Sequence, residues 1–139
     1  MQNKRRILIV EDNPDIAELL HIRLDLAGYS TCKTRDAASA VGAVYAYKPH
    51  AVLLDIGLPD QDGFSVLKAI KADAKTRDIP VLMLTARQAM GDIQAALKLG
   101  AKDYVTKPFD DRKLLIRIAR LWGESVPRPR PDDTRYVWG

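Results

Sequence analysis

Short apolar runs in this chain end, one after another, in side chains that can do chemistry. The run VLL ends at Asp55, an earlier run ends at Glu11 and Asp12, and later runs end at Thr85 and Lys107. Three carboxylates that lie close together repel one another unless a hard cation lies among them, and oxygen ligands of this kind suit Mg²⁺. With that cation bound, Asp55 is a nucleophile that can accept a phosphoryl group, whose oxygens Lys107 and the Thr85 hydroxyl can hold.

These side chains can meet only if the elements that precede them belong to one sheet. Short apolar runs predict strands, and apolar residues at helical spacing between the runs predict helices. The predicted strands cover residues 6–10, 29–34, 51–54, 79–84 and 103–105, and the predicted helices cover residues 14–27, 37–47, 64–72, 88–99 and 110–122. Buried strands that alternate with helices are typical of a parallel sheet covered on both faces. The sequence therefore predicts an α/β fold.

The handedness of such a fold decides where the strand ends lie. Right-handed crossovers place the carboxyl end of every strand at the same edge of the sheet. Ligands of these sheets bind at that edge, at the point where the strand order reverses. Pro14 suits a first helical turn, so either Asp12 or Asn13 is the expected N-cap of the first helix. We therefore expect the polar strand ends to form one site.

Composition limits the class of protein. Of the 139 residues, 47% are hydrophobic and 29% are charged, as in an ordinary globular domain. The single cysteine, Cys32, cannot form an internal disulfide, which favours a reducing cytoplasm. The net charge of +4 comes from dispersed basic residues and indicates solubility rather than nucleic-acid binding. No apolar run approaches the roughly 18–20 residues of a membrane helix, so we expect no membrane contact.

The character of the chain changes after Trp122. Residues 1–122 contain all the predicted elements, whereas residues 123–133 contain three prolines and alternating Pro-Arg pairs. We therefore predict one domain over residues 1–122 and a linker or tail over residues 123–139. The closing stretch RYVWG is apolar again. It fits either the first strand of a further domain or the ending of a stand-alone one.

Four stretches resemble a known family: VEDN, LLDIGLPDQDG, VLMLTA and GAKDYVTKPF. Over about residues 5–122 the chain resembles the receiver domain of bacterial two-component response regulators, which is related in fold to CheY. The resemblance implies a doubly wound (βα)5 fold with strand order 2-1-3-4-5. It also implies phosphorelay signalling, in which a sensor histidine kinase or phosphotransfer protein donates a phosphoryl group in a Mg²⁺-dependent reaction. Such a domain is a regulator that catalyses only its own phosphorylation and dephosphorylation, and its conformational switch controls an effector, for instance in transcription.

The resemblance assigns roles to the acidic end of the site. It implies that Asp55 is the phosphoacceptor and that Glu11, Asp12 and Asp55 hold Mg²⁺, with the Gly57 carbonyl as a further ligand. Many receivers carry two aspartates where this chain has Glu11 and Asp12. Because glutamate is longer by one methylene, we expect Glu11 either to reach the metal through water or to touch Lys107.

The resemblance also assigns the residues that respond to phosphorylation. It implies that Lys107 contacts the phosphoryl group and precedes a cis peptide bond to Pro108. Thr85 and Tyr104 are the implied switch pair: Thr85 moves toward the phosphoryl group, and the Tyr104 ring turns inward.

A second set of residues concerns self-association. The stretches TRDIPVLMLTAR and GAKDYVTKPF resemble the OmpR/PhoB branch, whose receivers dimerise through the fourth helix, the fifth strand and the fifth helix. Asp103 and Arg117 have the charges of one cross-subunit pair, and Lys102 and Glu124 have those of a second pair with the signs exchanged. We expect a weak homodimer through this face, and no direct contact between this domain and nucleic acid.

Two other classes share part of the pattern. Phosphatases of the haloacid-dehalogenase type also use a strand-end aspartate with Mg²⁺, but they need a second acid two residues later, where this chain has Gly57. Flavodoxin-like cofactor binders share the fold, but they cradle phosphate with amides, and the acidic loop at Glu11 and Asp12 repels phosphate. Both alternatives are disfavoured. A stand-alone receiver that acts through protein–protein interaction stays open beside a receiver that controls transcription.

Overall fold

The computed structural model describes residues 4–58, 63–86 and 90–124. Along these residues strands and helices alternate: β1 (Arg6–Val10), α1 (Pro14–Leu26), β2 (Ser30–Thr34), α2 (Ala37–Tyr47), β3 (Ala51–Asp55), α3 (Gly63–Ala72), β4 (Val81–Ala86), α4 (Met90–Lys98), β5 (Asp103–Lys107) and α5 (Asp111–Arg120). The predicted alternation of strands and helices is confirmed. No helix in these ranges is long and apolar enough to cross a membrane.

The strands form one parallel sheet in the order β2-β1-β3-β4-β5, which confirms the order implied by the resemblance. The chain reverses its direction of travel across the sheet after β2, so β1 and β3 are neighbours at the centre. In the register of these two strands, Val10 lies opposite Leu54. The residues that follow them, Glu11 and Asp55, are therefore brought together at the carboxyl edge.

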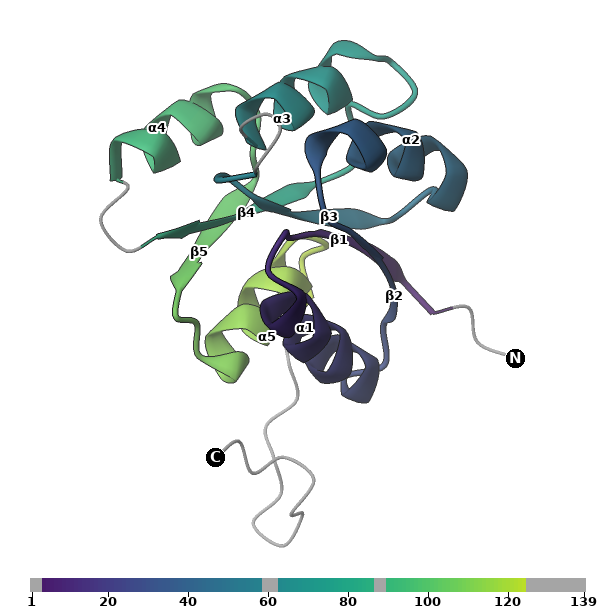
Figure 1. Ribbon diagram of the computed structural model, residues 1–139, viewed down its shortest axis with the longest axis vertical. Coiled ribbons are helices and arrows are strands. Elements are labelled where there is room, and N and C mark those ends of the chain that lie inside the picture. The colour runs from purple at the N-terminus through teal and green to yellow at the C-terminus, as the bar shows by residue number, and fades with distance from the viewer. Residues whose placement is uncertain (1–3, 59–62, 87–89, 125–139) are drawn as a thin grey trace, which may run out of the picture.

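Helices cover both faces of the sheet (Figure 1): α1 and α5 lie on one face, and α2, α3 and α4 lie on the other. Strand β1 illustrates why the central strands are apolar throughout: both of its faces are buried. Ile7 and Ile9 pack in the core beneath α1 and α5, whereas Leu8 and Val10 pack in the core beneath the other three helices. Because neither face meets water, no polar alternation is expected along the central strands.

The start of α1 decides which side chain is available to the site. Asn13 is the N-cap, and its Oδ1 accepts hydrogen bonds from the backbone N–H groups of Asp15 and Ile16 at 2.9 and 3.3 Å. Pro14 occupies the first helical turn, where a missing N–H costs nothing. Of the two expected caps, the chain uses Asn13, so the Asp12 carboxylate is not needed for capping.

Strands β4 and β5 each end two residues later than predicted, and both differences concern the site. Strand β4 begins at Val81 and continues through Ala86, and β5 continues to Lys107. The parallel ladder pairs Ala86 with Lys107, so backbone pairing runs on past the point where the side chains become polar. The predicted loop between residues 58 and 63, the predicted start of the fourth helix at residue 88 and the predicted tail from residue 125 onward fall largely outside the described residues.

Candidate functional site

Carboxylates from two neighbouring strands converge at the carboxyl edge of the sheet. Asp55 is the last residue of β3, and Glu11 and Asp12 directly follow β1. One oxygen from each of the three side chains lies within 4.8 Å of the others. The geometry therefore gathers the three acids that the sequence singled out.

Lys107 crosses to these acids from β5. Its Nζ lies 2.5 Å from Glu11 Oε1 and 3.1 Å from Asp55 Oδ2, so one ammonium joins residues from β1, β3 and β5. The Lys107 stem has to reach past β4, which lies between β3 and β5 in the sheet. Of the two positions expected for Glu11, the structure shows the contact with Lys107.

Burial makes this charge arrangement costly. The exposed fractions of Glu11 and Asp55 are 1% and 7%. Burial raises the pKa of Glu11 to about 7; the ion pair with Lys107 opposes this rise, and the nearby Asp55 carboxylate adds to it. Burial alone lowers the pKa of Lys107, but the Glu11 and Asp55 carboxylates raise it overall, so this ammonium stays charged.

The remaining contacts of the acids come from the backbone. The N–H of Asn13 donates to Glu11 Oε2 at 3.2 Å, and the N–H of Gly57 donates to Asp55 Oδ1 at 3.0 Å. Asp12 forms no hydrogen bond or ion pair with any residue that the structure describes. Three carboxylates thus lie together with one ammonium, which contacts two of them, and the formal excess of negative charge together with oxygen-only donors fits a divalent cation such as Mg²⁺.

Two glycines lie beside Asp55, and one of them allows a close approach of the backbone. A Cβ at Gly57 would lie 4.0 Å from Asp55 Oδ1, so any side chain there would face the carboxylate. A Cβ at Gly63 would lie 2.4 Å from the Asp55 carbonyl oxygen and 2.8 Å from Ile56 Cα, which no other residue permits. Sequence reasoning placed Gly63 only in a turn and missed this close approach, because nothing in the sequence shows which backbone atoms it faces.

Thr85 and Tyr104 extend the site toward β4 and β5. Asp55 lies opposite Leu84 in the ladder, so Thr85 is one residue beyond it, and its exposed fraction is 1%. Tyr104 lies on β5 and is half-buried. The Lys107–Pro108 peptide bond is cis. The Arg117 guanidinium carbon is 5.1 Å from the centroid of the Tyr104 ring.

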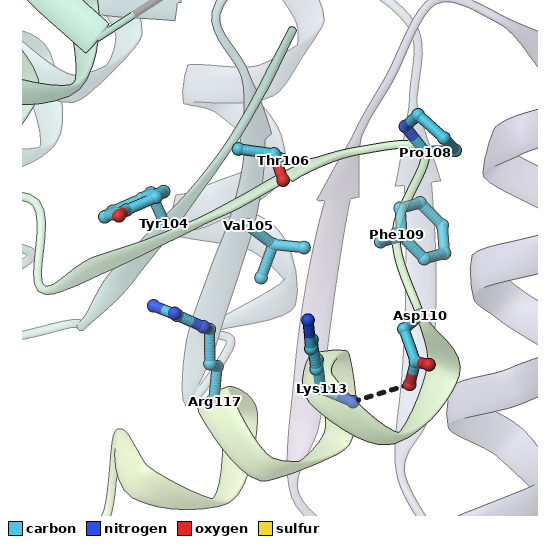
Figure 2. Close-up of a pocket in the computed structure, with 8 residues that line it drawn as sticks. All are labelled: Tyr104, Val105, Thr106, Pro108, Phe109, Asp110, Lys113 and Arg117. Atoms are coloured by element: carbon cyan, nitrogen blue, oxygen red, sulfur yellow. Dashed lines mark hydrogen bonds between the residues drawn. The ribbon is translucent and has the colours of Figure 1, made fainter. Parts of the chain in front are cut away.

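A cavity of about 370 Å³ opens beside Tyr104 (Figure 2). Strand β5, the following loop and the first turns of α5 line it with Tyr104, Val105, Thr106, Pro108, Phe109, Asp110, Lys113 and Arg117. Asp110 is the N-cap of α5 and accepts the backbone N–H of Lys113 at 3.1 Å. The ring of Tyr104 is thus next to open space on one side and next to the Arg117 cation on another.

Three of the four residues expected at the dimer face already have partners within the chain. Arg117 Nη1 lies 2.7 Å from Asp103 Oδ1, and Glu124 forms an ion pair with Arg5 rather than with Lys102. Sequence reasoning assigned both pairs to contacts between subunits. The pairing of Asp103 with Arg117 and of Glu124 with Arg5 inside one chain is a finding of the structure, and the dimer itself stays a prediction.

The family described as response regulator receiver domain matches residues 7–119, and the chain belongs to it. It is 40% identical over 116 residues to the DNA-binding dual master transcriptional regulator RpaA of Synechocystis, a match that covers 84% of this chain and 48% of that protein. It is 43% identical over 123 residues to the phosphate regulon transcriptional regulatory protein PhoB of Klebsiella pneumoniae, covering 88% of this chain and 54% of that protein. The chain therefore spans about half the length of these curated relatives.

Solved structures agree with this family. The receiver domain of the sensor histidine kinase PA1611 of Pseudomonas aeruginosa, solved with a magnesium ion coordinated in its active-site cleft, matches with a TM-score of 0.80 and 33% identity over 88% of this chain and 100% of that one. The chemotaxis response regulator CheY4 of Vibrio cholerae matches with a TM-score of 0.80 and 25% identity over 86% of this chain and 99% of that one.

These similarities decide the class of function. The chain is a receiver domain of two-component response regulators, and it acts in phosphorelay signal transduction. Receivers are signalling regulators that bind Mg²⁺ at an acidic pocket and interact with histidine kinases or phosphotransfer proteins. The resemblance inferred from the sequence is confirmed, and it displaces the phosphatase and flavodoxin-like alternatives.

Proposed function

We propose that Asp55 is the residue that accepts the phosphoryl group from a sensor histidine kinase or a phosphotransfer protein. The observation that carries this proposal is the contact set of its carboxylate. Asp55 Oδ2 faces the Lys107 ammonium at 3.1 Å, and Oδ1 accepts the Gly57 N–H at 3.0 Å, so both oxygens are oriented at the edge of the sheet. Glu11 is the more deeply buried of the two acids that contact Lys107, and it fits a supporting role.

The chemistry follows from these positions. An Asp55 carboxylate oxygen forms a bond to phosphorus while the bond from phosphorus to the donor's leaving atom breaks, and the leaving group takes its proton from water. Lys107 and the Thr85 hydroxyl hold the phosphoryl oxygens. Glu11, Asp12 and Asp55, with the Gly57 carbonyl, are the residues that would hold Mg²⁺. When bound, this ion supplies charge neutralisation at the phosphoryl oxygens.

Labelling with a small phosphodonor tests the assignment of the acceptor. Incubation with acetyl phosphate and Mg²⁺ should add one phosphoryl group to the wild-type chain and none to Asp55→Asn, as measured by intact-mass spectrometry. Asp25→Asn is the matched control, because Asp25 is an exposed aspartate on α1, and it should label like the wild type. Equal labelling of wild type and Asp55→Asn would exclude Asp55 as the acceptor.

Two residues extend this proposal to the response. We propose that Thr85 and Tyr104 are the switch pair. Its support is the burial of Thr85 beyond Asp55 and the open cavity beside the Tyr104 ring. Lys107→Ala should leave Mg²⁺ binding mostly intact while impairing this response, whereas Asp12→Ala should weaken metal binding and labelling together.

The dimer is part of the same proposal. A weak homodimer through α4, β5 and α5 would require Arg117 to exchange its intrachain partner Asp103 for the partner subunit's equivalent residue. Exposed ion pairs contribute roughly 0–1 kcal/mol each, so such an exchange is close to balanced and sensitive to salt. Sedimentation with and without beryllofluoride should show stronger dimerisation with the mimic. Arg117→Glu should abolish that gain, and Arg120→Glu, on the same helix, should keep it.

The output of the receiver is proposed from the relatives. RpaA and PhoB are named as transcriptional regulators, and this chain matches about half of each. We propose that residues 1–122 form the receiver, that residues 123–139 are a linker or tail, and that the receiver controls a transcriptional effector without touching nucleic acid itself. Its setting would be the cytoplasm, where ATP-dependent kinases supply the phosphoryl group. Deleting residues 125–139 should leave labelling of Asp55 unchanged if this division is right.

A further inference from the structure

The end of α5 is held at the amino edge of the sheet, opposite the candidate phosphoacceptor site. Trp122 is half-buried there, and three groups contact its indole. The Arg5 guanidinium carbon lies 4.2 Å from the ring centroid, and the Tyr29 ring lies at 5.8 Å with its plane tilted by 38°. The indole Nε1–H donates to the His50 carbonyl at 3.3 Å. A single side chain at the end of α5 thus contacts three different segments.

The two residues after Trp122 complete this attachment. Gly123 adopts a φ of +69°, a conformation that favours glycine, and it turns the chain back at the end of the helix. The N–H of Glu124 then donates to the Ala119 carbonyl at 2.9 Å, and the Glu124 carboxylate forms an ion pair with Arg5. Arg5 therefore contacts both the ring of Trp122 and the carboxylate of Glu124.

We call Arg5, Tyr29, His50, Trp122 and Glu124 the amino-edge clamp. Its members precede β1, β2 and β3 or follow α5, so the helix end is attached to the sheet. His50 is itself fixed to the start of β1, because its N–H donates to the Arg6 carbonyl at 2.7 Å and its Nδ1 accepts the Arg6 N–H at 2.8 Å. The clamp is tied to the central strands, which are the most buried part of the fold.

The other part of α5 belongs to the proposed switch. Arg117 contacts Asp103 and stacks on Tyr104, and it lies five residues before Trp122. Five helical residues span about 7.5 Å, so the same short helix contacts the switch region at one point and the clamp at another. Arg117 lies in the last turn of α5, so both contacts lie toward the C-terminal end of the helix. A rigid helix that is fixed at its C-terminal end can respond to a change elsewhere along its length only by pivoting about the fixed end.

We infer that the clamp is a fixed pivot, with Arg5 and Trp122 as positioning residues that hold the end of α5 still when the receiver is activated. The inference rests on the proposed phosphorylation of Asp55. The switch then moves the part of α5 that carries Arg117, while residues 122–124 stay where they are. The response leaves the domain through the face around Arg117, and the point from which the chain continues past Glu124 is not displaced.

Nuclear magnetic resonance can follow both the switch region and the clamp in the full chain. The indole Nε1–H signal of Trp122 is distinguished from that of Trp138, the other tryptophan of the chain, with Trp122→Phe. On addition of beryllofluoride and Mg²⁺, the backbone amide signals of Tyr104 and Arg117 should shift, and the Trp122 indole signal should not. A Trp122 indole shift as large as that of the Arg117 amide would overturn the fixed pivot.

A variant of the clamp gives a second readout that needs no activation. Arg5→Ala should accelerate amide hydrogen exchange at residues 119–124 by about tenfold, and Lys4→Ala, at the exposed neighbouring residue, should leave it unchanged. In Arg5→Ala, beryllofluoride should also shift the Trp122 indole signal, an effect that a purely stabilising contact would not produce. Unchanged exchange in Arg5→Ala would overturn the clamp. If beryllofluoride moves no signal around Asp55, the proposed function fails, and the exchange measurement still decides the clamp.

Discussion

The two edges of the sheet hold their charges in opposite ways. At the carboxyl edge, the carboxylates of Glu11, Asp12 and Asp55 lie close together, and one ammonium pairs with the first and the last of them. These two paired acids are nearly inaccessible to water. That arrangement has an excess of negative charge in a place where charge is poorly solvated. Binding of a cation or attachment of a phosphoryl group would therefore change the charge balance of this site.

At the amino edge the positive and negative charges of the clamp are equal in number and partly exposed to solvent. Arg5 is paired with Glu124, and their side chains are 36% and 48% exposed. Aromatic rings and backbone hydrogen bonds supply the remaining contacts. The fold thus places its responsive chemistry and its mechanical attachment on opposite edges of the sheet. It uses buried, unbalanced charge for the first and partly exposed, balanced charge for the second.

The largest effect should come from removing the cation at the carboxyl edge. Lys107→Ala leaves Glu11 and Asp55 buried without their ammonium, and breaking a buried ion pair in this way costs about 3 kcal/mol or more. Urea unfolding at pH 8 in metal-free buffer measures the free energy of unfolding. Lys98→Ala, at an exposed lysine of α4, is the control and should change it little. Equal losses in the two variants would show that the Lys107 ion pairs do not stabilise the fold.

A smaller effect should appear as a dependence on pH. The pKa of Glu11 in the folded chain, about 7, lies above its ordinary value of 4.5, so the folded state holds this proton more tightly than the unfolded state does. The corresponding stability is present below pH 4.5 and is lost as the pH rises to about 7, a loss on the order of 1–3 kcal/mol. Glu11→Gln should remove this slope in metal-free urea titrations between pH 5 and pH 8. A slope that persists in the variant would assign it to another group.

The amino edge should respond less. Arg5→Ala removes one cation–π contact and one exposed ion pair, which together contribute about 1 kcal/mol. Thermal or urea unfolding should show this loss at low salt, and part of it should vanish at high salt because the ion pair is screened. Lys4→Ala is the control. A loss as large as that for Lys107→Ala would contradict the contrast between the two edges.

The smallest effect should come from His50, whose contribution to stability should increase with pH, whereas that of Glu11 decreases. Burial, with Arg6 and Arg5 nearby, lowers the pKa of His50 below 6.5, so the unfolded state holds this proton more tightly. The corresponding stability is present above pH 6.5 and is lost as the pH falls through the folded-state pKa, since protonation also removes the acceptor for the Arg6 N–H. His50→Gln should flatten this part of the profile, measured between pH 7 and pH 5. An unchanged profile would show that His50 does not titrate in this range.

Much of the site could be predicted because the end of a buried strand is marked in the sequence by an apolar run that stops at a polar residue. Apolar runs that stop at Glu11, Asp55 and Thr85 name the residues at the ends of buried strands, and the handedness of βα crossovers then places them at one edge. The fold class followed from the alternation of strands and helices, and the strand order followed from the family resemblance. The ends of β4 and β5 were each predicted two residues too early, because backbone pairing continues under polar side chains.

The partners of long charged side chains could not be predicted in the same way. Sequence patterns indicated that Asp103 and Arg117 are complementary, but they could not show that the two residues meet within one chain. The pairing of Arg5 with Glu124 joins the two ends of the domain, 119 residues apart, and no local pattern indicates it. The sequence left two contacts open for the Glu11 carboxylate, one with the metal through water and one with Lys107. Only the structure shows the contact with Lys107.

The order of the strands in the chain also decides when the residues of the site are synthesised. Asp55 and Lys107 are 52 residues apart in the chain, and Glu11 belongs to the first strand to be synthesised while Lys107 ends the last. A nascent chain therefore carries its acids long before it carries the ammonium that joins them. Because domains generally fold as units during synthesis, a chain interrupted before β5 would present uncompensated acids and no complete site. The site is thus complete only when β5, the last strand to be synthesised, has joined the sheet.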